Sequence, residues 1–228
     1  MTGTGFCVMS IVMKTIVTAF SSSVGKKLLM AFTGILLSLF LIAHAIGNST
    51  TFLGLDAFNS YAEHLHSLGC LISLFEIGLL IIFLAHVSIA TILFFQNLQA
   101  RSTRYQVQKS SGGRSPGSRT MPYTGLIILI FIIVHLGNFH FIEKTTTIGV
   151  LVKDTLSQPV TTLFYIVAMA ALILHISHGF WSLFQTLGIN HPKYNCTIRT
   201  GGLGVTFILG AIFVLIPILA LVWTGFLS

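Results

Sequence analysis

Five long apolar segments constrain the fold of this chain more than any other feature of its sequence. They lie at about residues 28–47, 71–96, 123–141, 160–187 and 203–223. An α-helix needs roughly 20 apolar residues to cross the hydrocarbon core of a bilayer, which is about 30 Å thick. Charged residues make up 7% of the chain, against about 25% in a typical soluble domain. The sequence therefore predicts an all-α membrane protein with five transmembrane helices.

The domain organisation follows from these segments. We expect a single membrane domain over residues 21–228, preceded by a weakly patterned N-terminal segment at 1–20. Lys26 and Lys27, an apolar run and Ala43-His44-Ala45 imitate a secretory signal peptide with its cleavage site. Because the basic residues lie far from the start and cleavage would remove His44, we interpret this stretch as the first transmembrane helix.

The sequence also predicts structure outside the apolar segments and a kink inside the last one. The connection over residues 49–69 contains a helical pattern at 56–66, which is too short and too polar to span a membrane. We expect this helix to lie along the outer surface. Residues 101–119 are rich in Ser, Gly and Arg, which is typical of a flexible connection. Pro217 predicts a kink near the end of the fifth helix.

Basic residues predict the orientation of the chain in the membrane. Ten of the twelve lie on one side of the predicted helices: Lys14, Lys26, Lys27, Arg101, Arg104, Lys109, Arg114, Arg119, Lys193 and Arg199. Positive charges concentrate in cytoplasmic loops, so we expect the N-terminus in the cytoplasm and the C-terminus outside. Contacts with anionic lipid explain the net charge of +7, and we expect no nucleic-acid partner.

The three cysteines, Cys7, Cys70 and Cys196, show no paired spacing. The chain has no C-x-x-C-H motif, which argues against covalently attached c-type haem, and it has no zinc-binding pattern. We therefore expect three free thiols.

Four histidines lie inside the apolar segments, one in each of the first four: His44, His86, His135 and His175. Ionisable side chains are costly at that depth and by default mark a functional site. Buried histidines that hydrogen-bond to neighbouring backbone would be an alternative explanation. Four in consecutive segments favour a shared ligand instead.

The alternating direction of the helices assigns a depth to each histidine. His44 and His135 fall near the outer ends of helices that run outward, whereas His86 and His175 lie deep in helices that run inward. At a rise of 1.5 Å per residue, the outer and inner pairs are separated by roughly 15 Å. Two facing imidazoles at each depth are what two bis-histidine haems require. All four histidines are therefore candidate axial ligands of haem iron.

A short motif repeats in the first and third segments. Nine residues separate Thr33-Gly34 from His44, and nine residues separate Thr124-Gly125 from His135, so each glycine lies ten residues before its histidine. A glycine at this spacing lies at the depth of the other histidine pair, where it allows close approach of a macrocycle or a helix. Ordinary packing of small residues explains Gly34 and Gly125 equally well.

The remaining histidines are weaker candidates for ligands. His178 lies three residues beyond His175 on nearly the same helical face, so either could bind iron. Matching depth and context with His86 favour His175. His64, His66, His140 and His191 lie in loops or near a membrane surface, where we expect surface or interfacial roles.

Several motifs together resemble a known family. They are Lys26-Lys27 with His44-x-x-Gly-Asn, Met121-Pro-Tyr-Thr-Gly125, His175-x-x-x-Gly179-Phe-Trp181 and Phe184-Gln-Thr-Leu-Gly-Ile-Asn-His-Pro-Lys-Tyr194. The chain resembles the five-helix, di-haem cytochrome b (b558-type) membrane anchors of succinate dehydrogenase and fumarate reductase, over about residues 21–227. In that family the first and third histidines hold the outer haem, and the second and fourth hold the inner haem. The resemblance matches Gly179 to the glycine four residues after the family's last ligand, which supports His175 over His178.

The resemblance also implies cofactors, partners and a location. It implies two haem b groups, menaquinone or another quinone as substrate, and a multi-pass location in the bacterial cytoplasmic membrane. A flavoprotein with FAD and an iron–sulfur subunit would dock on the cytoplasmic face, and the whole complex could form a dimer. Succinate or fumarate would react on the flavoprotein, linking the tricarboxylic acid cycle to the respiratory chain. This chain would be the quinone-reactive membrane subunit of the enzyme.

Quinone chemistry also needs a group that exchanges protons. Glu76 is a carboxylate inside a segment, ten residues outward of His86, and Glu63 lies in the outer connection. We expect either residue to serve an outer quinone site, although Glu76 could instead be an ordinary hydrogen-bonded residue near the membrane surface.

Two other functions remain open from the sequence. One is the di-haem anchor of another respiratory dehydrogenase, of the hydrogenase or formate dehydrogenase type. The other is a haem-free transporter or channel that uses intramembrane histidines to move protons; inverted repeats and broken helices are common in such transporters, and neither is evident here.

Overall fold

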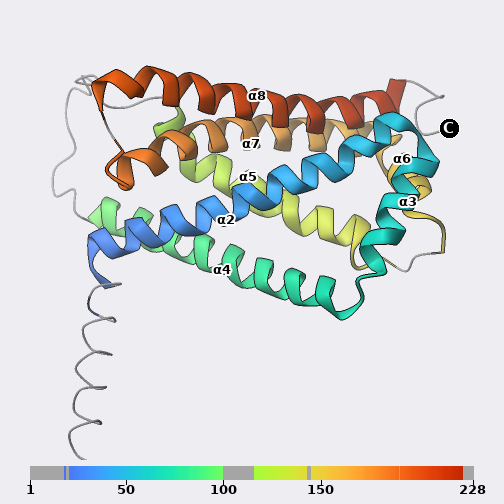
Figure 1. Cartoon of the computed structure of the whole chain (residues 1–228), viewed down its shortest axis with the longest axis horizontal. Coiled ribbons are helices and arrows are strands. Elements are labelled where there is room, and N and C mark those ends of the chain that lie inside the picture. Colours follow the sequence, from blue (N-terminus) through green and yellow to red (C-terminus); the bar gives the residue numbers. More distant parts are fainter. Residues whose placement is uncertain (1–17, 19–20, 100–115, 143–144, 190, 223–228) are drawn as a thin grey trace, which may run out of the picture.

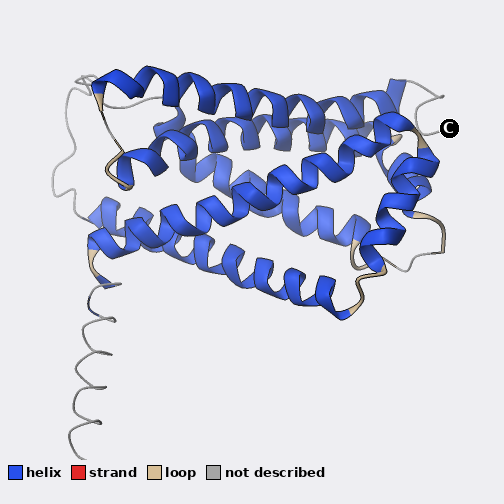
Figure 2. Ribbon diagram, viewed as in Figure 1, coloured by secondary structure: helices blue, strands red, loops and turns tan. Residues whose placement is uncertain are grey.

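The computed structural model describes residues 18, 21–99, 116–142, 145–189 and 191–222. Within these residues every regular element is a helix (Figures 1 and 2). The elements in chain order are α2 (Ser23–Ser49), the 3₁₀ helix η1 (Thr50–Leu53), α3 (Leu55–His66), α4 (Cys70–Gln99), α5 (Pro116–Phe139), α6 (Ile148–Leu156), α7 (Pro159–Thr186) and α8 (Pro192–Val222).

Five helices of the described residues are long and apolar enough to cross a membrane, and they are α2, α4, α5, α7 and α8. They lie side by side along the long axis of the molecule (Figure 1). This confirms the predicted all-α fold with five transmembrane helices.

The helix ends differ from the predicted segment ends where the chain becomes polar. α5 begins at Pro116 and α8 begins at Pro192, both well before the first apolar residues of the predicted segments. Hydropathy marks only the part of a helix that lies in lipid, whereas the hydrogen bonds of a helix continue into the headgroup region. Proline is also favoured at the first helical position, where its missing N–H costs nothing.

The predicted flexible connection at 101–119 is therefore wrong in its last part. Residues 116–119 form the first turn of α5, and residues 100–115 lie outside the described part of the chain. The N-terminal segment at 1–20 also lies outside the described residues except for Thr18. α8 continues through Pro217 as one uninterrupted helix.

A side-chain cap fixes the start of the first helix. The hydroxyl of Ser22 accepts a hydrogen bond from the backbone N–H of Gly25, at 3.0 Å. Serine is among the preferred residues at this position, because its oxygen satisfies a donor that the helix itself leaves unpaired.

The long helices form three closely packed pairs. α2 packs against α4, α5 packs against α7, and α7 packs against α8. α2 also contacts α7, and α8 covers α7 and α2 from the outside. Among the described helices, α4 packs closely only against α2. The first four long helices thus form a bundle of two pairs, with α8 added along one side (Figure 1).

Two short helices, α3 and α6, lie together at one end of this bundle (Figure 1). Asn59 of α3 accepts a hydrogen bond from the backbone N–H of Gly149 in α6, at 2.9 Å. Phe58 of α3 is buried in a cluster with Leu156 of α6 and Tyr165 of α7. The helix predicted at 56–66 is thus confirmed, and the cluster fastens it to the bundle. α6 was not predicted from the sequence.

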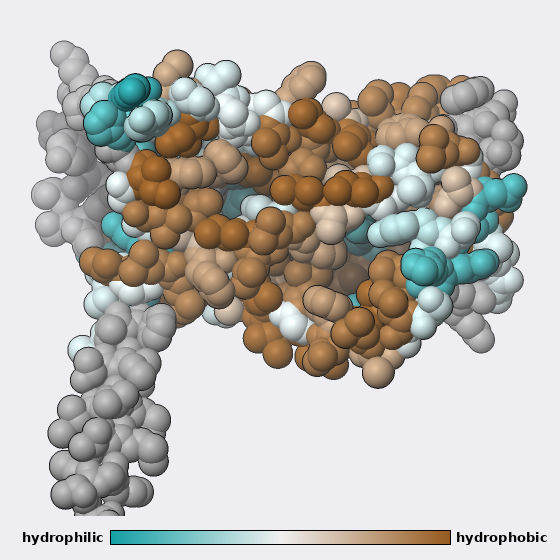
Figure 3. Space-filling view, viewed as in Figure 1, coloured by the Kyte–Doolittle hydropathy of each residue, from teal (hydrophilic) through white to brown (hydrophobic). Residues whose placement is uncertain are grey.

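The sides of the bundle are apolar and its ends are polar (Figure 3). Large side chains such as Leu74 and Phe75 of α4 are two-thirds exposed. Soluble proteins rarely expose contiguous apolar patches larger than a few hundred Å². Lipid is the solvent that fits such a surface, so the chain is a multi-pass membrane protein.

Candidate functional site

The outer pair of histidines faces each other across α2 and α5. The ring centroids of His44 and His135 are 5.9 Å apart, and the rings are nearly perpendicular, at 88°. Apolar rings surround the pair. Phe40 stacks on His44 at 5.4 Å, and Phe213 of α8 lies 5.8 Å from it.

His135 lies among aromatic rings, and one of its nitrogens has no hydrogen-bond partner in the described part of the chain. Phe131 and Phe139, one turn before and after it, pack against its ring at 5.4 and 5.2 Å. Tyr165 of α7 lies 6.1 Å away, and its hydroxyl accepts a hydrogen bond from Asn138. Nδ1 of His135 is buried and has no hydrogen-bond partner. Buried polar atoms of this kind are rare and need a specific explanation.

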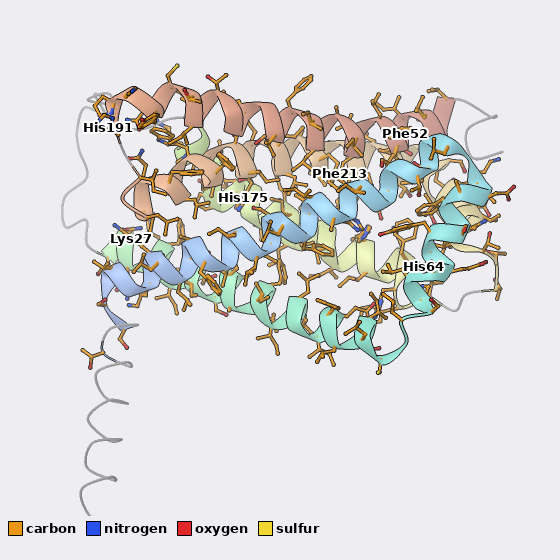
Figure 4. All side chains as sticks on the ribbon, in the orientation of Figure 1. Lys27, Phe52, His64, His175, His191 and Phe213 are labelled. Carbon is orange, nitrogen blue, oxygen red and sulfur yellow. The ribbon has the colours of Figure 1, made fainter. Side chains whose placement is uncertain are left out.

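The inner pair, His86 of α4 and His175 of α7, is held by two threonines. Oγ1 of Thr33 is 2.9 Å from Nδ1 of His86. Oγ1 of Thr124 is 3.2 Å from Nδ1 of His175. The two imidazoles are close enough to interact electrostatically. Figure 4 shows His175 among the helices, far from either end of the bundle.

The glycines next to these threonines face the same two imidazoles. A Cβ added to Gly34 would lie 3.6 Å from Cε1 of His86, and one added to Gly125 would lie 3.5 Å from Cε1 of His175. Both distances are ordinary contacts, so the glycines bring the helix backbones against the inner rings. Gly34 and Gly125 thus lie at the inner depth, as their spacing from His44 and His135 predicts.

These contacts also give the separation of the two pairs. Thr33, which touches His86, lies eleven residues before His44 on α2, and Thr124 lies eleven residues before His135 on α5. At 1.5 Å per residue this places the inner and outer pairs roughly 16 Å apart along the bundle.

His175 has contacts that match those of His86. Each ring lies against a threonine and a glycine of a neighbouring helix, and His178 interacts with His175 from the next turn of α7. This similarity favours His175 over His178 as the counterpart of His86. His64 lies at one end of the bundle and His191 at the other, away from both pairs (Figure 4).

The structure brings Glu76 together with a histidine that the sequence did not connect to it. Oε1 of Glu76 in α4 is 3.9 Å from Nδ1 of His140, directly after α5, and both side chains are about half exposed (49% and 48%). Glu63 is exposed on α3. Cys70 and Cys196 are free and exposed, as predicted, and Cys7 lies outside the described residues.

The spacing of the outer pair fits a haem held by two axial histidines. Metal–nitrogen bonds are about 2 Å long, so two imidazoles that share an iron have ring centres roughly 6 Å apart. The 5.9 Å between His44 and His135 matches this spacing. The described residues contain no group of three or more His, Cys, Asp or Glu that could hold a metal ion, but axial haem ligation needs only two.

Some of these residues were missed by the sequence analysis. The Thr-Gly repeat pointed to the glycines, and the same spacing places the threonine hydroxyls at the inner depth. No sequence pattern linked Asn138 to Tyr165 or His140 to Glu76, because these pairs lie on different helices.

Five membrane-length helices, four of which carry a histidine inside the bundle, define a class of multi-pass helical membrane proteins with intramembrane histidines. A relative makes this class more specific. The chain is 28% identical, over 167 residues, to the succinate dehydrogenase cytochrome b558 subunit of Bacillus subtilis. The similarity covers 71% of this chain and 78% of the relative. No protein-family model and no solved structure matches the chain.

This chain is thus similar to the cytochrome b subunit of a succinate dehydrogenase. Together with the five apolar helices, the relative is consistent with a multi-pass protein of a bacterial inner membrane.

Proposed function

We propose that this chain is the di-haem cytochrome b subunit of a succinate:quinone oxidoreductase. His44 and His135 would hold the outer haem, and His86 and His175 the inner haem. The observation that carries this proposal is the placement of paired imidazoles at two depths of one membrane bundle. The Bacillus subtilis relative supports the succinate dehydrogenase type over the hydrogenase and formate dehydrogenase types.

The chain's own residues would position and insulate the cofactors. When bound, the haems supply one-electron carriers between the two faces of the membrane. The imidazoles would hold the iron atoms, and the rings of Phe40, Phe131 and Phe213 would keep water away from the outer pair. Gly34 and Gly125 leave room beside the inner imidazoles.

The ends of the bundle differ in charge in a way that supports the predicted orientation. Among the described residues, the basic side chains at the end where α2, α5 and α8 begin are Lys26, Lys27, Arg119, Lys193 and Arg199. The opposite end carries Asp56, Glu63 and Asp154, with Lys153. By the positive-inside rule the first end is cytoplasmic. The flavoprotein, with its FAD, and the iron–sulfur subunit would dock there, and dicarboxylates would react on the flavoprotein.

We place a quinone site near the outer haem, beside Glu76 and His140. Both side chains are half exposed at the outer end of the bundle, where a lipid-soluble quinone can approach them. A carboxylate and an imidazole can exchange the protons that accompany quinone oxidation and reduction. Glu63, on α3 at the same end, is the second candidate.

Substitutions of these groups test the quinone site. Glu76→Gln and His140→Asn should each lower quinone-linked turnover at least tenfold while both haems remain, because each removes a proton-exchanging group. Glu63→Gln should do the same if that carboxylate serves instead. Asp154→Asn is the control, since it removes a charge on the neighbouring α6. Unchanged turnover in a variant rules out that residue.

Replacement of the histidines tests the ligand assignment. In the purified complex, succinate should reduce b-type haem in the wild type. His44→Ala and His135→Ala should each abolish the same one of two haem signals, and His86→Ala and His175→Ala the other. His178→Ala should retain both. A variant pair that affects different haems would contradict the pairing.

A further inference from the structure

The two threonines next to the inner histidines each have a single hydroxyl proton to donate, and backbone carbonyl oxygens lie within hydrogen-bond distance of both hydroxyls. Oγ1 of Thr33 lies 2.9 Å from the carbonyl oxygen of Leu29 and 3.1 Å from that of Met30. A carbonyl oxygen can only accept, so the hydroxyl donates its proton there. The same oxygen is then left to accept a hydrogen bond from Nδ1–H of His86.

Thr124 repeats this arrangement on α5. Its hydroxyl lies 3.1 Å from the carbonyl oxygens of Thr120 and Met121, and 3.2 Å from Nδ1 of His175. Thr33 and Thr124 are 4% and 5% exposed, so water does not compete for these bonds. This direction of donation would hold the proton of both inner histidines on Nδ1 and leave Nε2 free as a metal ligand.

His135 of the outer pair differs from the inner histidines in this respect. Nδ1 of His135 is buried without a hydrogen-bond partner. A partner on the second ring nitrogen fixes the orientation of a metal-binding imidazole and raises its basicity. The inner ligands have such partners, whereas His135 has none.

The threonines also link the two depths. α2 and α5 each carry an outer histidine, and each supplies one threonine to an inner histidine on a neighbouring helix. Both inner rings are thus oriented by the helices that bind the outer site.

We infer that Thr33 and Thr124 are positioning residues of the inner haem site, which set the tautomer and basicity of His86 and His175. This inference rests on the proposed di-haem function. An acceptor on Nδ1–H makes the imidazole a stronger ligand for ferric iron, so its removal should raise the midpoint potential of the inner haem. Loss of such a partner commonly lowers metal affinity about 10–100-fold. A tenfold loss confined to the ferric form equals about 59 mV for one electron.

The test compares matched threonine variants in the purified complex. Thr33→Val and Thr124→Val keep the shape of the side chain and remove the hydroxyl, whereas Thr33→Ser and Thr124→Ser keep the hydroxyl. Thr206→Val is the control. The hydroxyl of Thr206 in α8 is also buried, and it donates a hydrogen bond to the carbonyl oxygen of Gly202, at 2.8 Å, rather than facing a histidine. The readouts are haem content, the midpoint potential of each haem, and its low-temperature electron paramagnetic resonance signal.

The valine variants should raise the potential of one haem, or remove it, and that haem should be the one lost in His86→Ala. The serine variants and Thr206→Val should keep both haems with wild-type potentials. The inference is overturned if the valine variants leave both potentials unchanged, if they affect the haem lost in His44→Ala, or if serine or the control has the same effect as valine. Absence of two haems from the wild type would instead overturn the proposed function, so the two failures are distinguishable.

Discussion

At the scale of single residues, Gly34 occupies the position where any side chain would first meet the inner site. A Cβ at this position would meet Cε1 of His86, the ring carbon between the two nitrogens. A methyl group there would make an ordinary contact at 3.6 Å. A longer side chain would extend past that carbon into the space beside the iron-binding nitrogen.

We therefore expect Gly34→Ala to retain both haems and Gly34→Leu to lose the inner one, so that haem content falls from two per chain to one. Gly78→Leu is the matched control, because a Cβ at Gly78 of α4 would meet nothing within 4 Å. Haem quantitation and difference spectra of the purified complex would check this. Full haem content in Gly34→Leu would show that the glycine does not border a cofactor.

The sequence could predict the histidines but only part of what surrounds them. Ionisable residues in apolar segments stand out from their neighbours, and helix direction alone gives their depth. The partners of these residues depend on how helices rotate against each other. Thr33 reaches His86 and Glu76 approaches His140 only because of that rotation, which no local pattern encodes.

At the scale of helices, small residues set the contact between α7 and α8. Gly202, Thr206 and Gly210 are spaced four residues apart on α8 and are all buried. A Cβ on Gly202 would collide with the ring of Phe180, and one on Gly210 with the side chain of Ile173. Small residues at this spacing let membrane helices approach closely.

Gly202→Leu should consequently separate α8 from α7 and lower the thermal stability of the complex. Gly204→Leu, two residues away on a face where a Cβ would meet nothing within 4 Å, should change the melting temperature little. Thermal denaturation of the detergent-solubilised complex, followed by loss of the haem spectrum, measures both. Equal melting temperatures for the two variants would contradict this packing.

The helices themselves were predictable to the extent that they lie in lipid. Apolar runs located all five long helices, and the pattern at 56–66 located α3. α6 escaped prediction because Ile148–Leu156 is short and follows directly on polar residues. The early starts of α5 and α8 escaped because polar residues near a membrane surface form helix as readily as apolar ones do in lipid.

At the scale of the whole molecule, the charges at its two ends and the histidines between them suggest one path for electrons across the membrane. The basic end would face the iron–sulfur subunit, the inner histidines come next, and the outer histidines and the Glu76–His140 pair lie toward the opposite end. Because a bilayer core of about 30 Å insulates the two faces, a carrier at each of two depths divides the crossing into shorter transfers.

The central claim is that each chain holds two haems, and haem stoichiometry tests it most directly. The complex would be purified through this chain, its haem extracted and quantified, and the chain itself quantified by amino-acid analysis. Two haem b groups per chain are the predicted result. A ratio of one or zero in an intact complex would contradict the pairing of four histidines at two depths.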